Sequence, residues 1–178
     1  MTTTTSIRPL ELLVALLNET YQTGARIADD GGVHLRMDDD LAVSVAASAD
    51  GRDLVFYAPL ADLLRGRSVA LMTAALSMNL HQDLTRGGAI AVEPATQTLL
   101  YCWRMDAAAP DPERLAWGLE NFCGTAADLR LRLDEALADF TVDELAEIDR
   151  RAAHDEALSE DAPLASPASS NAAHIVRG

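Results

Sequence analysis

Histidine and cysteine are the residue types best suited to nucleophilic or metal chemistry, and this chain spaces them too widely for either. The six of them are His34, His81, His154, His174, Cys102 and Cys123. Metal sites need ligands at helical or knuckle spacing, and a nucleophile needs a base within hydrogen-bond reach. The histidines share no such spacing with the cysteines, so we predict no catalytic residue, no metal site and no cofactor, and we expect a protein that is not an enzyme.

Two further motifs could bind ions, and both are better explained as turns. Asp38, Asp39 and Asp40 are consecutive, whereas calcium loops alternate their ligands and supply a later Glu. The Gly87-Gly88 pair lacks the Gly-Lys-Ser/Thr ending or the third glycine of a phosphate-binding loop. We therefore expect a solvated turn at each place.

The charge of the chain restricts its partners. Its 28 acidic residues outnumber 14 basic ones, all of them Arg, and the formal net charge is -14. Such a field repels phosphate backbones and anionic lipid, so we expect neither nucleic acid nor membrane as a partner. It favours solubility and attracts basic partner segments. Two cysteines fit a reducing compartment, and no targeting or membrane-spanning segment is evident, so the expected location is the cytoplasm.

A helix is predicted between Ser6, which can cap it, and Gly24, which can end it. Its apolar residues recur at helical spacing. They are Leu10, Leu12, Leu13, Val14, Leu16, Leu17 and Tyr21. Because they cover more than one narrow face, we expect part of this helix to contact a partner.

Residues of alternating polarity then predict three strands in an antiparallel meander. The strands are 33–37, the segment around 43–45, and 54–57, with Pro59 expected to end the third. Helical spacing returns over 68–82, where Ala, Leu and Met occupy nearly every side, so burial all round is expected. Two more strands, 89–92 and 98–105, follow a turn at Gly87-Gly88.

A long helix is predicted from Asp111-Pro112 to about Leu137, because a capping carboxylate precedes a proline in the first turn. A capping box at 141–144 predicts a further acidic helix. The expected organisation is a domain at 1–140, an acidic helical extension at 141–160, and a disordered tail at 161–178 that is rich in Pro, Ser and Ala. The predicted fold class is an α+β sandwich of one twisted antiparallel sheet and helices, plus the C-terminal acidic helix.

Four short strings accompany this order of elements: Gly-Val-His-Leu-Arg-Met-Asp-Asp-Asp at 32–40, Leu-Met-Thr-Ala-Ala-Leu-Ser-Met-Asn-Leu at 71–80, Gly-Gly-Ala-Ile-Ala-Val-Glu at 87–93, and Thr-Leu-Leu-Tyr at 98–101. Together with the order, they resemble the class I type III secretion chaperones, the family of the Tir chaperone. The resemblance covers about 7–137. None of the strings carries a catalytic residue.

The resemblance implies a cytoplasmic homodimer that binds the extended N-terminal segment of a secreted effector, keeps it unfolded and delivers it to the export ATPase. It implies a dimer interface at Val69, Met72, Ala75, Leu76, Asn79 and Ile90. It implies an effector groove at Leu10, Leu13, Val14, Leu17, Val33, Leu35 and Met37, with strand 33–37 as the free sheet edge. An edge strand beside apolar pockets can bind an extended peptide through its backbone, which makes this mode physically reasonable.

A second class of function stays open at this point. A regulatory binding protein of the same fold could sequester a transcription factor or an anti-sigma factor, because a fold does not fix a function.

Overall fold

The computed structural model describes residues 8–37, 41–63, 67–107 and 111–138, and five helical positions between 143 and 151. The elements are α1 (Arg8–Thr20), β1 (Val33–Arg36), β2 (Ala42–Ala47), β3 (Asp53–Asp62), α2 (Ser68–Leu80), α3 (Gln82–Thr85), β4 (Ala89–Glu93), β5 (Thr98–Asp106) and α4 (Pro112–Ala138). This is the predicted order with one short helix, α3, added after α2.

The five strands form one antiparallel sheet in the order β1-β2-β3-β5-β4. The first three follow one another as the predicted meander, and β5 pairs along the free side of β3. The hairpin of β4 and β5 then places β4 at one edge of the sheet, while β1 is the other. The predicted α+β class with a single antiparallel sheet is confirmed.

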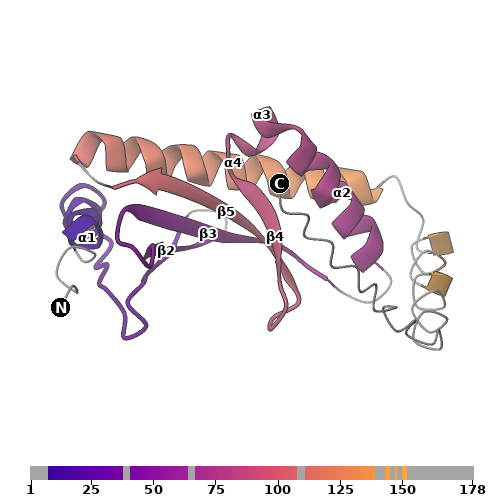
Figure 1. The fold of residues 1–178 in the computed structure, drawn as a ribbon, viewed down its shortest axis with the longest axis horizontal. Helices are drawn as coiled ribbons and strands as arrows, with labels where there is room; N and C mark the ends of the chain where they lie inside the picture. Colours follow the sequence, from indigo (N-terminus) through magenta and orange to yellow (C-terminus); the bar gives the residue numbers. More distant parts are fainter. Residues whose placement is uncertain are drawn as a thin grey trace, which may run out of the picture.

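Long helix α4 covers the sheet, as Figure 1 shows, with α1 and α2 at opposite ends of the molecule. Alternate strand residues such as Val43, Val45 and Phe56 are buried against this helical layer, as the period of two along a strand requires. Aromatic rings join the layers: the Phe56 and Phe122 ring centroids are 5.4 Å apart, and those of Tyr101 and Phe122 are 5.0 Å apart. The core therefore lies between α4 and the middle strands β3 and β5.

Tyr101 also anchors α3, the segment that the sequence did not predict. Its hydroxyl donates a buried 2.7 Å hydrogen bond to the backbone oxygen of Thr85. Burial raises the pKa of Tyr101 to about 12, because desolvation disfavours the phenolate. The short helix is thereby held to the centre of the sheet.

The predicted end of the third strand is wrong. Strand β3 does not end at Pro59 but continues to Asp62, with a register shift between Pro59 and Ala61 opposite β5. The pairing of β2 stops at Tyr57, so β3 has no β2 partner beside Pro59, and a proline without an N–H is tolerated there. Within a single chain, Leu76 and Leu80 of α2 are exposed, so burial of this helix on every side requires a partner.

The C-terminal predictions are tested only in part. Asp143, Glu144, Glu147, Arg150 and Arg151 are helical, and Glu147 forms ion pairs with both arginines, at 2.6 and 2.9 Å. The rest of the predicted extension at 141–160 and the predicted tail at 161–178 lie outside the described residues.

Gly88 allows the turn before β4 to lie directly against β5. A Cβ atom at Gly88 would lie 2.4 Å from Tyr101 Cε2 and 2.7 Å from the backbone oxygen of Cys102. We expect Gly88→Ala to destabilise the fold by about 1–3 kcal/mol, because a buried ring and backbone must move. The matched control is Gly124→Ala, where a Cβ atom has no neighbour within 4 Å and a helix gains about 1 kcal/mol. Thermal unfolding should move in opposite directions; equal shifts would contradict this packing.

Candidate functional site: a free sheet edge beside an apolar wedge

The two edges of the sheet differ in what remains available for a partner. At the β4 edge, the Asn79 amide donates a 2.9 Å hydrogen bond to the Ile90 backbone oxygen. The Ile90 N–H in turn donates to Asn79 Oδ1 at 2.7 Å. Both backbone groups of Ile90 are therefore satisfied by α2, which closes this point of the edge against another strand.

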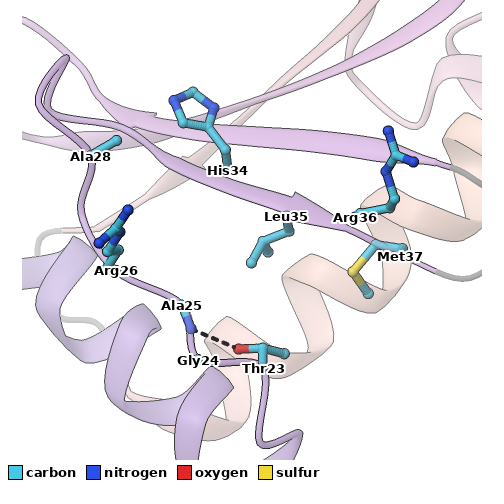
Figure 2. A pocket seen from close by; sticks show the side chains of 9 residues that line it. All are labelled: Thr23, Gly24, Ala25, Arg26, Ala28, His34, Leu35, Arg36 and Met37. Atoms are coloured by element: carbon cyan, nitrogen blue, oxygen red, sulfur yellow. Dashed lines mark hydrogen bonds between the residues drawn. The ribbon is translucent and has the colours of Figure 1, made fainter.

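At the opposite edge, the described part of the chain covers only the beginning of β1. Ile27 forms an isolated antiparallel bridge with Val33, and the Ala28 N–H donates to the Gly32 backbone oxygen at 2.8 Å. Beyond Val33, the segment 23–28 diverges from the strand, as Figure 2 shows. Between them lies a pocket of about 470 Å³, which we call the wedge. It is lined by Thr23, Gly24, Ala25, Arg26, Ala28, His34, Leu35, Arg36 and Met37.

His34 holds the 27–32 loop, which precedes β1, in place. Its ring has Nε2 2.9 Å from Asp30 Oδ2 and Nδ1 2.9 Å from Ser44 Oγ. The Gly32 N–H and the His34 ring both bond the Asp30 carboxyl group and lower its pKa, since these contacts favour the charged form. Sequence reasoning missed this cluster because Ser44 lies ten residues from His34 and meets it only through the pairing of β1 with β2.

Asp30, His34 and Ser44 have the residue types of a hydrolytic triad, but not its environment. In such a triad the aspartate is buried, and an oxyanion site accompanies the nucleophile. Here the side chains of His34 and Asp30 are 50% and 63% exposed. We therefore interpret the cluster as a structural contact that positions the 27–32 loop on the sheet.

Residues expected to form the effector groove fall into two groups. Leu10, Leu13, Leu17 and Val33 are buried in the core. Val14, Leu35 and Met37 are half-buried, and the last two line the wedge. The helix stripe thus faces α4 and the sheet, so its three leucines support the site without lining it. Arg26 and the backbone of 23–25 were not predicted as part of the site, because no sequence pattern indicates that this loop lines a pocket.

Residues expected at a dimer interface also differ in accessibility. Ala75 and Ile90 are buried, Val69, Met72 and Asn79 are half-buried, and Leu76 is 69% exposed. Leu80, one turn beyond Leu76, is 80% exposed. Val92 of the edge strand β4 is also exposed. The outward side of α2 is therefore an apolar stripe formed by Met72, Leu76 and Leu80, spaced four residues apart.

Other kinds of site find little support in the part of the chain that the structure describes. There, no three His, Cys, Asp or Glu side chains gather in a way that could hold a metal ion. None of the described helices has the length and apolar character needed to cross a membrane. Burial raises the pKa of both cysteines, that of Cys123 to about 11, so neither is an activated thiol.

Comparison with known proteins identifies the family and the fold. The family described as Tir chaperone protein (CesT) matches residues 12–130. No curated protein sequence matches the chain. Among solved structures, the HopA1-SchA chaperone-effector complex is similar at 12% identity and a TM-score of 0.56, covering 73% of this chain and 98% of that one.

Two further structures share the fold. The ExsC-ExsE complex gives 17% identity and a TM-score of 0.59, covering 74% of this chain and 97% of that one. The Yersinia pestis type III secretion chaperone SycH, in complex with a YscM2 fragment, gives 19% identity and a TM-score of 0.50, covering 68% and 98%. At these identities the likeness establishes the fold.

Proposed function

Because the chain belongs to the Tir chaperone protein (CesT) family, we propose that it is a cytoplasmic chaperone that binds the extended N-terminal segment of a type III secreted effector. The client segment lies along β1 in the wedge. The chaperone keeps the effector unfolded for export and assists its delivery to the export apparatus, with the export ATPase as a further partner. It acts by binding and catalyses no reaction.

The difference between the two sheet edges carries this proposal. An extended peptide gains backbone hydrogen bonds by adding to a free sheet edge, and pockets beside the edge select alternate side chains. The β4 edge is occupied at Ile90 by Asn79, whereas β1 beyond Val33 has a wedge beside it lined by Leu35 and Met37. A client strand at β1 therefore meets both a backbone partner and apolar side chains.

A homodimer through α2 completes the proposal. Leu76 and Leu80 expose large apolar surfaces on one side of the helix. A second copy of the same stripe covers them in a two-fold symmetric contact. Figure 1 shows α2 far from α1 along the molecule, so pairing through α2 leaves the wedge of each subunit accessible.

Capture of the client tests this function. We expect the tagged chain, recovered from its own bacterium, to carry a secreted protein whose N-terminal segment resists limited proteolysis only while bound. Mass spectrometry of the protected fragment identifies the segment. Recovery of a folded transcription factor or anti-sigma factor, without a protected extended segment, would favour the regulatory alternative and contradict the chaperone proposal.

A further inference from the structure

Strand β4 is an edge strand with few of the features that usually stop an edge from pairing with another chain. Such edges are commonly blocked by charged side chains, by proline, by bulges or by a covering element. From Ala89 to Val92 the strand has only small or apolar residues, and three of these four are exposed. Its single charged residue, Glu93, is the last of the strand. Protection of this edge therefore has to come from outside the strand.

The backbone groups that could bind another strand alternate along β4. Ile90 lies opposite Tyr101 in the pairing of β4 with β5, yet its N–H and C=O both bond the Asn79 amide, at 2.7 and 2.9 Å. These groups therefore point away from β5, to what we call the open side. Because alternate residues of an antiparallel strand point their backbone groups the same way, the N–H and C=O of Val92 also lie on the open side.

Helix α2 and the turn before β4 occupy the other backbone groups on the open side. The Gly88 N–H, two residues before Ile90, donates to the Thr85 backbone oxygen at 2.8 Å. Asn79 bonds both groups of Ile90, so within the described part of β4 only Val92 can bond another strand. Two hydrogen bonds do not offset the entropy that a second strand loses on being ordered. Without Asn79, two successive residues on the open side become available.

We propose that Asn79 is an edge-blocking residue, which prevents β4 of one copy from pairing with β4 of another. An antiparallel strand that pairs with its own copy forms a two-fold contact, so each partner contributes the same donors and acceptors. By occupying Ile90 from α2, Asn79 leaves too short a stretch of strand for this contact. This role in limiting assembly goes beyond client binding and does not depend on it.

The mass of Asn79→Ala in solution tests this role. Light scattering over about a hundredfold range of concentration should show the variant associating, at high concentration, to at least about twice the wild-type mass. Circular dichroism of the same samples checks that the variant is folded. If Asn79→Ala is unfolded, Asn79→Ser takes its place, since its hydroxyl is one bond shorter than the amide. The reference is the wild-type mass at the same concentration, so the result is independent of the proposed dimer.

Two further variants separate an open edge from a weakened subunit. Proline lacks an N–H and is tolerated on an edge strand where that N–H would face solvent. Val92→Pro, added to Asn79→Ala, removes a donor from the open side, so the double variant should return to the wild-type mass. Met78→Ala is the matched control, because it truncates a buried side chain of α2 and keeps Asn79. It should lose stability without associating.

Each contrary result would overturn the proposal. A folded Asn79→Ala variant with the wild-type mass would show that β4 needs no block. Association of Met78→Ala, or of the double variant, to the same extent would show that association follows loss of stability. Unfolding of both Asn79 variants would assign the amide to the subunit's own fold. None of these results bears on client binding at β1.

Discussion

We expect Leu76→Glu to convert the proposed dimer to a folded monomer. Leu76 is largely exposed within one subunit, so its replacement removes little from the subunit's own core. In a two-fold interface each substitution acts twice, and burying one leucine contributes about 2 kcal/mol. The expected loss is about 4 kcal/mol, or about a thousandfold in the dissociation constant. Repulsion between the two new carboxylates adds to it.

Light scattering combined with circular dichroism checks this result. The matched control is Leu131→Glu, since Leu131 is also a well-exposed leucine but lies on α4. The control should remain a dimer with an unchanged melting temperature. A wild-type monomer, or a Leu76→Glu variant that stays dimeric, would contradict the pairing of the α2 stripe with a second copy.

Periodicity in the sequence was sufficient for the order of all the elements except the short helix α3, and for most of their bounds. Val43 and Val45 alternate with small or polar residues, and this alternation depends only on neighbouring positions in the chain. The end of β3 was predicted wrongly because it depends on a neighbouring strand and not on adjacent residues in the chain. Pro59 is tolerated because β2 pairs only as far as Tyr57, and the length of a neighbouring strand is not encoded in the residues around a proline.

The site was harder to predict because accessibility depends on which elements cover a residue. Leu17 and Leu76 both lie on apolar helical stripes, yet one is buried and the other is 69% exposed. Leu17 is buried because α4 packs over α1, and no sequence pattern indicates this packing. The closure of Ile90 by Asn79 and the contact of His34 with Ser44 likewise appear only when distant segments meet.

We expect Met37→Asp to weaken client binding strongly while the protein stays folded, and Leu17→Asp to unfold it. Met37 is half-buried and lines the wedge, so a carboxylate there can reach water in the free protein. Packing apolar client side chains against it would remove that water, which is costly for a charged group. Leu17 is only 1% exposed, so a carboxylate at that position is buried without a partner, at a cost of about 4 kcal/mol or more. Sequence reasoning alone placed both residues in one groove, with one expected effect.

Thermal unfolding and capture of the effector segment, measured on the same preparations, separate the two effects. Met37→Asp should lose at least about tenfold in affinity, because the client's apolar side chains no longer find an apolar wall. Leu131→Asp serves as the control for placing a carboxylate on an exposed leucine away from the wedge, and it should bind normally. Normal binding by a folded Met37→Asp variant would show that the wedge is not the client site. A stable, folded Leu17→Asp variant that failed to bind would instead assign the client site to the apolar stripe of α1.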